Sequence, residues 1–267
     1  MKGIVFFDLD GTLLDNTRGI IPESTLQALD ELRKGYIVAL STGRDMDSHY
    51  SVKWKKLVAP DVIIHMNGTK ITIGDRLLFE HYMDKKLLSR IYDFSLEADI
   101  CFGTTILDRD YYTIPEKKTR ADLAFTREIK RNYRPFSELI DGDVRIHALS
   151  YAGDLAKDKP VIEEAFPELE LLGFDSGAGA DVVEKGFSKA EGLRRVCEHY
   201  GIDRSHTYAF GDSQNDLMII KEAGVGVAMG NAVPELKERA DLVTDPIWDD
   251  GIYKACVRLG LIGGSNT

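Results

Sequence analysis

The amino-acid sequence predicts an α/β fold in which a doubly wound parallel β-sheet forms a core, with an α+β domain inserted into it. Short apolar runs alternate with amphipathic helical patterns in the first and last thirds of the chain, as expected of parallel βαβ units. The middle of the chain instead has shorter strand-like segments that are rich in Tyr, Thr and charged residues. Neither outer part looks complete alone, so we expect the two parts to form one discontinuous core.

The first third is predicted to contain three buried strands and two helices. Its first strand is apolar throughout and ends at Asp8, which is typical of a strand buried on both faces. The first helix has Pro22 at its start and ends at Gly35, positions that suit these residues in helices. The expected strands are at 3–7, 36–41 and 61–64, and the expected helices are at 22–35 and 45–58.

The middle of the chain begins after Asn67-Gly68, a dipeptide that favours tight turns. Segments 69–73 and 76–80 form a predicted hairpin, and residues 82–184 form a predicted α+β domain with an antiparallel sheet. Within this domain we expect helices at 83–98, 121–131 and 159–166, and strands at 99–102, 104–107, 111–114, 145–151, 169–174 and 181–183. The predicted core then comprises residues 1–81 and 185–267.

The last third returns to the parallel pattern after Gly186. Ser188 and Glu191 have the spacing of a capping box, which predicts a helix from this point to Tyr200. The other expected elements are strands at 207–210, 225–229 and 241–244, and helices at 215–223, from 233 onward, and at 251–258.

The composition excludes several classes of protein. The 267 residues include 34 Lys and Arg against 44 Asp and Glu, a net charge of −10, which argues against a nucleic-acid binder or a basic membrane-surface protein. The three cysteines, Cys101, Cys197 and Cys256, fit neither a disulfide framework nor a CxxC metal site. The first apolar run is too short for a signal peptide or a membrane span, so we expect a soluble, cytoplasmic protein.

The segment from Asp8 to Thr12 carries the sharpest chemical signal. Asp8 and Asp10 follow a predicted buried strand directly, and Gly11 allows a turn after them. Ligands of open parallel sheets bind at the carboxyl ends of strands, and paired carboxylates suit Mg²⁺. The alternative is an Asx-type turn that closes the strand.

Three further polar motifs flank predicted strands or helices of the core. Asp212, Asn215 and Asp216 follow another buried run, where the alternative is an ordinary helix N-terminus. The segment from Ser41 to Arg44 suits phosphate oxygens, although Arg44 also suits a structural ion pair. Lys189 opens a predicted helix, and the alternative there is a solvated surface lysine.

Together these motifs resemble those of the haloacid dehalogenase-like phosphatases, and within them the Cof-type group with a type IIB cap. The motifs in chain order are DLDGTLL, STGR, GFSKAEGL, AFGDSQNDLMI, GVAMGNA and DDGI. They extend over essentially the whole chain, and the combination of DxDGT with GDxxND is specific. The resemblance implies a Rossmann-like core and a cap domain at 82–184 that closes over the site.

The resemblance also implies a role for each acid of the core. Asp8 would be the nucleophile that forms an aspartyl-phosphate, and Asp10 would be the general acid and base. Asp8, the main-chain carbonyl of Asp10, and Asp212 would hold Mg²⁺, with Asp216 beside the metal.

Further residues are implied in phosphate and substrate binding. The transferring phosphoryl group would be bound by the main chain near Leu9 and by Thr42, Gly43, Lys189 and Asn215. Lys185 competes for the role of Lys189, which better matches the G-x-S-K pattern. Arg44 and Arg109 are candidate substrate contacts, and the segments 108–112 and 175–179 are candidate cap loops or, alternatively, a charged turn and a flexible connector. Asn67-Gly68 and the segment 228–232, which includes Asn231, are expected to shape the site or the hinge.

The function that the resemblance implies is that of a Mg²⁺-dependent phosphatase acting on a small phosphorylated metabolite, such as a sugar phosphate or a cofactor phosphate. Asp10 supports this reading, because ion-pumping relatives carry Thr at that position. The alternatives are a phosphomutase of similar architecture and a non-catalytic protein that binds a phosphometabolite. We expect no nucleic-acid or membrane partner, and a monomer or weak dimer.

Overall fold

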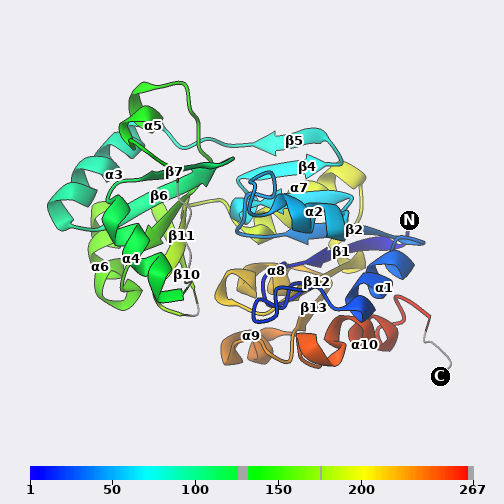
Figure 1. Ribbon diagram of the computed structural model, residues 1–267. Helices are drawn as coiled ribbons and strands as arrows, with labels where there is room; N and C mark the ends of the chain where they lie inside the picture. The colour runs from blue at the N-terminus through cyan, green and yellow to red at the C-terminus, as the bar shows by residue number, and fades with distance from the viewer. Residues whose placement is uncertain (126–131, 175, 264–267) are drawn as a thin grey trace. The chain divides into compact units, whose positions relative to one another are not determined.

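The structure is a computed structural model that describes residues 1–125, 132–174 and 176–263. The chain divides into two compact units, coloured along the chain in Figure 1. The first unit comprises Met1–Asp45, Trp54–Phe79 and Phe187–Thr267, and the second comprises Met46–Lys53 and Glu80–Gly186. Each unit is built around its own β-sheet.

The first unit contains an eight-stranded sheet in the order β14-β13-β12-β1-β2-β3-β4-β5. Its first six strands are parallel, and β4 pairs antiparallel with β3. Every residue of the central strand β1 is buried, as its uninterrupted apolar sequence predicts. The strands are β1 (Gly3–Phe7), β2 (Tyr36–Ser41), β3 (Val62–His65), β4 (Lys70–Ile73), β5 (Arg76–Glu80), β12 (Thr207–Gly211), β13 (Val225–Ala228) and β14 (Leu242–Val243).

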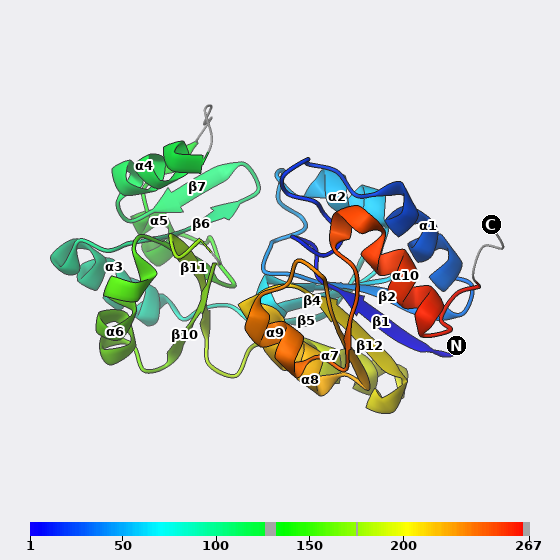
Figure 2. The same ribbon diagram turned by 90° about the horizontal axis from the view of Figure 1, so that it is seen from below.

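Helices cover both faces of this sheet. Figure 2 shows α1 and α10 on one face and α7 and α8 on the other, which is the doubly wound arrangement that the alternating pattern predicts. The helices are α1 (Glu23–Leu32), α2 (Val52–Val58), α7 (Lys189–Tyr200), α8 (Leu217–Glu222), α9 (Pro234–Arg239) and α10 (Gly251–Arg258).

Two predicted helices of the core are shorter than expected. The helix predicted at 45–58 begins only at Val52, because residues 45–51 form turns in which Val52 N–H and Ser51 N–H both donate to the Ser48 carbonyl. Asp and Ser favour such local turns over helix interiors. The helix predicted at 215–223 is a 3₁₀ turn (Gln214–Asp216) followed by α8. The predicted hairpin is present, and it extends the core sheet.

The second unit contains a six-stranded sheet in the order β10-β11-β9-β6-β7-β8. Its pairs are antiparallel except for β7 and β8, which are parallel. The strands are β6 (Cys101–Ile106), β7 (Arg109–Tyr112), β8 (Tyr133–Arg134), β9 (Leu149–Ala152), β10 (Leu169–Gly173) and β11 (Gly179–Glu184). The helices are α3 (Lys85–Ala98), α4 (Pro115–Phe125), α5 (Ser137–Asp141) and α6 (Leu155–Ala165).

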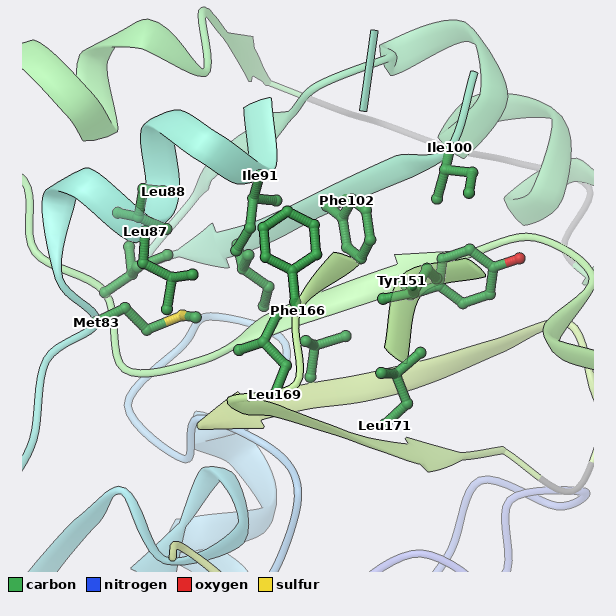
Figure 3. Packing of buried hydrophobic residues seen from close by; sticks show 14 of the residues in the cluster. Met83, Leu87, Leu88, Ile91, Ile100, Phe102, Tyr151, Phe166, Leu169 and Leu171 are labelled. Carbon is green, nitrogen blue, oxygen red and sulfur yellow. The ribbon is translucent and has the colours of Figure 1, made fainter. Parts of the chain in front are cut away.

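The second unit has a hydrophobic core of its own. Figure 3 shows Ile91 of α3 and Phe166, which follows α6, directed toward Phe102 and Leu169 of the sheet. Ile91 and Phe102 are fully buried, and all other members of this cluster are at most 6% exposed. Helices α3 and α6 therefore pack against the sheet through this core, an α+β arrangement.

Several elements of the second unit differ from the predictions. The strands predicted at 99–102 and 104–107 are one strand, β6, in which Gly103 does not break the pairing but lets the Tyr112 ring approach. Helix α6 begins four residues before the predicted start, because the Asp154 side chain caps it by accepting from the Lys157 N–H. Pro160 therefore lies inside the helix and not at its start.

The bounds of α4 and β9 also differ from the predicted ones, and two short elements have no predicted counterpart. Helix α4 begins at Pro115 rather than Ala121, and residues 126–131 of its predicted span lie outside the described residues. Strand β9 occupies only the end of the predicted span 145–151. The short elements β8 and α5 were not predicted.

Cys101, Cys197 and Cys256 are all buried and free, as expected. Within the part of the chain that the structure describes, no helix combines the length and the apolar character needed to cross a membrane.

Candidate active site

Three neighbouring strands of the first unit are each followed by a residue predicted to be functional. Strand β1 is followed by Asp8, β2 by Thr42 and β12 by Asp212. Because β1 lies between β2 and β12 and is parallel to both, these residues leave the same edge of the sheet. The carboxyl edge of an open parallel sheet is the usual place for a ligand.

Lys189 is fully buried at the start of α7 and faces these strand ends. Its Nζ donates to Asp8 Oδ1 at 2.6 Å and to Asp216 Oδ1 at 2.6 Å. Burial alone would lower the pKa of Lys189, but the Asp216 and Asp8 carboxylates raise that pKa above its ordinary value. The alternative of a solvated lysine is therefore wrong, and the side chain is a fixed cation within the acid cluster.

The start of α7 places Lys189 there. The Ser188 hydroxyl accepts from the Glu191 main-chain N–H at 3.1 Å, so the predicted N-cap is present. The Glu191 carboxylate forms ion pairs with Arg194 and Arg195. Lys185 belongs to the second unit, where its Nζ donates to the Pro167 carbonyl.

Asp212 is held against the loop that follows β1. Its Oδ1 accepts from the Thr12 hydroxyl at 2.9 Å. A Cβ on Gly11 would lie 2.1 Å from Asp212 Oδ2, and Gly11 has φ +83°, so only glycine fits there. Thr12 was not among the predicted site residues, although it belongs to the DLDGT motif that signalled the site.

Both carboxylate oxygens of Asp216 accept hydrogen bonds from other groups of the protein. Oδ2 accepts from the main-chain N–H groups of Asp212 at 3.0 Å and Ser213 at 3.1 Å, and Oδ1 accepts from Lys189. Asp216 and Ser213 form a capping box, so the predicted alternative of a helix N-terminus is also correct for this acid. These contacts orient the loop that carries Asp212.

An amide network joins this loop to the strands on the other side of the site. Asn215 Oδ1 accepts from Lys189 Nζ at 3.2 Å, and its Nδ2 donates to Asn67 Oδ1 at 3.3 Å. The main-chain N–H of Asn67 in turn donates to the Thr42 carbonyl at 3.0 Å. Asn231 donates to the Gly11 carbonyl at 2.8 Å and so contacts the loop that follows β1.

The acids of the cluster are too close together to be ionised easily without a further cation. Oxygens of Asp8, Asp212 and Asp216 lie within 4.8 Å of one another. Burial raises the pKa of Asp8 to about 7, against the lowering effect of Lys189. Burial together with the Asp8 and Asp216 carboxylates raises the pKa of Asp212 to about 9. Hard carboxylate oxygens in excess over the local cations fit a divalent ion such as Mg²⁺.

Asp10 forms an ion pair with Arg44. Arg44 Nε donates to Asp10 Oδ2 at 2.6 Å, and Arg44 Nη2 donates to Asp10 Oδ1 at 2.6 Å. Of the two interpretations of Arg44, the structure shows an ion pair, but with an acid that is itself predicted to be functional.

The structure brings most of the predicted site residues together in the first unit. Leu9 is buried and its carbonyl accepts from the Leu13 and Leu14 N–H groups, and Gly43 lies between Thr42 and Arg44. Arg109 lies in the second unit, exposed at the start of β7, so its contact with substrate stays a prediction. In the predicted cap loop 175–179, residue 175 lies outside the described residues.

Comparison with known proteins places this geometry in a family. The profile of haloacid dehalogenase-like hydrolases matches residues 5–256. The Bacillus subtilis protein YkrA is 34% identical over 97% of this chain and 98% of its own length. The B. subtilis 5-amino-6-(5-phospho-D-ribitylamino)uracil phosphatase YcsE is 30% identical over 94% of this chain and 93% of its own.

Solved structures agree with this placement. The subclass IIB sugar phosphatase BT4131 superimposes with a TM-score of 0.85 at 27% identity, covering 97% of this chain and all of its own. BT1666 from Bacteroides thetaiotaomicron superimposes with a TM-score of 0.87 at 25% identity, covering 97% of this chain and 96% of its own. The chain therefore belongs to the haloacid dehalogenase-like hydrolases, and within them to the Cof-type phosphatases that its motifs predict.

Proposed function

We propose that this phosphatase hydrolyses a small phosphorylated metabolite with the help of Mg²⁺ and through an aspartyl-phosphate on Asp8. The observation that carries the proposal is the contact of buried Lys189 with Asp8 and Asp216 at 2.6 Å each, beside the carboxylate of Asp212. A buried lysine that binds the proposed nucleophile can stay in place when that carboxylate gains a phosphoryl group, whose negative charge it then neutralises.

The proposed reaction has two steps, each with a defined proton. An Asp8 oxygen attacks phosphorus while the bond to the leaving-group oxygen breaks, and Asp10 gives that oxygen a proton. Water then attacks the phosphorus of the aspartyl-phosphate and gives a proton to Asp10, and the bond to Asp8 breaks. The products are the alcohol and inorganic phosphate, and the protein is regenerated.

The site residues have separate tasks in this proposal. Asp8, Asp212 and the main-chain carbonyl of Asp10 would hold Mg²⁺, which when bound supplies positive charge for in-line attack on the phosphate dianion. Lys189, Asn215, Thr42 and the main chain at Leu9 and Gly43 would bind the phosphoryl oxygens. Asp216 would orient Asp212 through its contacts with the Asp212 and Ser213 N–H groups.

The proposed substrate is a sugar phosphate or a cofactor phosphate. YcsE is named for a phosphoribityl compound and BT4131 for sugars, so both names describe small polyhydroxylated substrates. We further propose that residues 82–184 act as a cap that excludes water from the reaction and contacts the leaving group. Specificity would then depend on the second unit, and fold similarity alone does not determine it.

The nucleophile assignment is tested with Asp8→Asn, which removes the attacking carboxylate but preserves an oxygen for Lys189. We expect no Mg²⁺-dependent hydrolysis of p-nitrophenyl phosphate and no acid-stable ³²P label on the protein, with the Tm of a folded chain. The matched control is Asp75→Asn, in the exposed turn between β4 and β5, which should retain full activity. Turnover by Asp8→Asn at the rate of the unsubstituted protein would contradict the proposal.

The substrate class is tested by a panel of sugar, nucleotide and cofactor phosphates, with the products analysed for each. We expect release of inorganic phosphate from at least one sugar or cofactor phosphate. Transfer of the phosphoryl group to another hydroxyl would indicate a phosphomutase instead, and tight binding without turnover would indicate a non-catalytic binding protein.

A further inference from the structure

We propose that Arg44 is a positioning residue for Asp10, and that it orients the Asp10 carboxylate for proton transfer rather than binding the substrate. This inference rests on the proposed function, because it assumes that Asp10 is the general acid and base. It assigns to Arg44 an effect on the proton-transfer steps that a contact with the phosphoryl group would not have.

The geometry of the Arg44–Asp10 pair indicates that Arg44 orients the Asp10 carboxylate as well as attracting it. Two different guanidinium nitrogens, Nε and Nη2, donate to the two different oxygens of Asp10 at 2.6 Å each. This fork arrangement fixes the plane of the carboxylate as well as its position, which a single lysine donor would not do.

The solvent exposure of the Arg44–Asp10 pair supports the same conclusion. The side chains of Arg44 and Asp10 are 35% and 32% exposed, and ion pairs open to solvent contribute little to folding stability. The main consequence of the contact is therefore the direction in which Asp10 points. In the absence of Arg44, solvent would compete for the carboxylate and its side chain could rotate.

The main chain on both sides of the pair is held by hydrogen bonds within the loops that follow the strands. The Arg44 N–H donates to the Thr42 hydroxyl at 3.1 Å, and the Arg44 carbonyl accepts from the Met66 N–H at 3.2 Å. On the other side, the Gly11 N–H donates to the Leu14 carbonyl at 2.9 Å and closes the turn after Asp10. Arg44 therefore connects Asp10, which follows β1, to the segments that follow β2 and β3.

Such positioning matters because proton transfer depends strongly on geometry. A well-placed general acid or base contributes roughly 100-fold to 10,000-fold to the rate, and small misplacements remove much of this effect. Attack by Asp8 does not itself require Asp10 when the leaving group is stable as an anion. Loss of Arg44 should therefore lower kcat/KM most for substrates whose leaving groups need a proton, and least for those whose leaving groups are stable as anions.

The experiment compares Arg44→Met with the unsubstituted protein on two aryl phosphates in the presence of Mg²⁺. We expect kcat/KM for phenyl phosphate, whose leaving group needs a proton, to fall about 100-fold. We expect kcat/KM for p-nitrophenyl phosphate, whose leaving group is stable as an anion, to fall less than about 5-fold. The activation of water by Asp10 should also slow, so hydrolysis of the aspartyl-phosphate should limit turnover. The first turnover should then release p-nitrophenol in a burst equal to the enzyme concentration.

Two further variants keep the test decisive. Arg44→Lys retains the charge but not the fork, and its loss on phenyl phosphate should lie between those of Arg44→Met and the unsubstituted protein. The matched control is Arg194→Met, which removes a two-bond pair between α7 and α8, with Glu222 at 2.9 and 2.7 Å. It should leave both kcat/KM values unchanged.

The possible outcomes separate this inference from the proposed function. Equal losses of kcat/KM on both aryl phosphates would overturn the inference, because they indicate contact with the phosphoryl group. Unchanged kcat/KM on both would also overturn it, leaving only a structural ion pair. Failure of the proposed function would show instead as retained turnover in Asp8→Asn, whatever the leaving-group dependence of Arg44→Met.

Discussion

The acid cluster predicts that Asp212→Asn makes the metal-free protein more stable while it abolishes activity. Asp212 is 8% exposed and lies beside Asp8 and Asp216. Asparagine has the same shape and keeps an oxygen that can accept from Thr12. The substitution therefore removes a crowded charge and preserves the hydrogen bond.

The expected magnitude follows from the pKa of Asp212. Its usual value is 3.8, and burial with the neighbouring acids raises the folded value to about 9. At pH 7, folding must therefore bind a proton that the unfolded chain does not hold, which opposes folding by at most about 4 kcal/mol. Since Asp8 shares this proton uptake, we expect Asp212→Asn to gain about 1–3 kcal/mol, or roughly 5 °C in Tm.

The assay is thermal unfolding in EDTA as a function of pH. Well below the usual pKa of 3.8, the Asp212 carboxyl is protonated in both the folded and the unfolded chain, so the Tm values of the two proteins should agree. The advantage of Asp212→Asn should grow as the pH rises from about 4 toward about 9, because the unsubstituted protein loses stability through this range. Added Mg²⁺ should raise the Tm of the unsubstituted protein and leave that of the variant unchanged.

The exposed substitution Asp75→Asn provides the control, and its Tm should follow that of the unsubstituted protein at every pH. A Tm for Asp212→Asn that equals or falls below that of the unsubstituted protein at pH 8 would refute the reasoning. It would mean that the acids do not oppose folding, and the electrostatic argument for a divalent cation would fail with it.

Three further predictions concern the same unit. Lys189→Met leaves Asp8 and Asp216 without their shared cation, so the free energy of unfolding in urea should fall by about 3 kcal/mol and turnover should be lost; unchanged stability would contradict this. Gly11→Ala places a Cβ 2.1 Å from Asp212 Oδ2, so Tm and Mg²⁺ affinity should both fall, whereas Gly19→Ala, with no atom within 4 Å, should keep its Mg²⁺ affinity. Burial raises the pKa of Cys256 to about 12, so a thiol reagent at pH 8 should label it only after unfolding, and rapid labelling of the native protein would show that it is accessible.

The core of the fold could be predicted from sequence because its elements carry local signals at their ends. Strand β1 stops where apolar residues give way to Asp8, and α10 occupies the predicted span 251–258. The start of α2 could not be predicted in this way, since the helical periodicity extends into residues whose turns compete with the helix. The local sequence pattern predicts the bounds of a helix or strand only where no competing turn can satisfy the same backbone hydrogen-bonding groups.

The second unit was harder to predict because its elements depend on contacts between distant segments. Strand β8 has only two residues and exists through its parallel pairing with β7. Gly103 would end an isolated strand, but here it accommodates the ring of Tyr112 on the neighbouring strand. Neither feature has a signal within its own segment.

The candidate site was predictable as a set of residues but not as a set of contacts. The positions of Asp8, Asp212 and Lys189 in their motifs indicated that they meet. The sequence left open whether Lys189 is buried and whether Arg44 binds the substrate, because both depend on side-chain directions that only the folded loops determine. The contact between Arg44 and Asp10 joins residues of two motifs that lie 34 positions apart in the chain.

The charges of the site explain how an acidic protein can accept a phosphate. Asp8, Asp10, Asp212 and Asp216 bring four carboxylates to the strand ends, against the cations of Lys189 and Arg44. With all six groups ionised, the excess is two negative charges, which a divalent cation would balance. A phosphate dianion would then meet a neutral site with its positive charge turned toward it, although the chain as a whole has a net charge of −10. Removal of the cation should therefore abolish binding of the substrate while it leaves the fold intact.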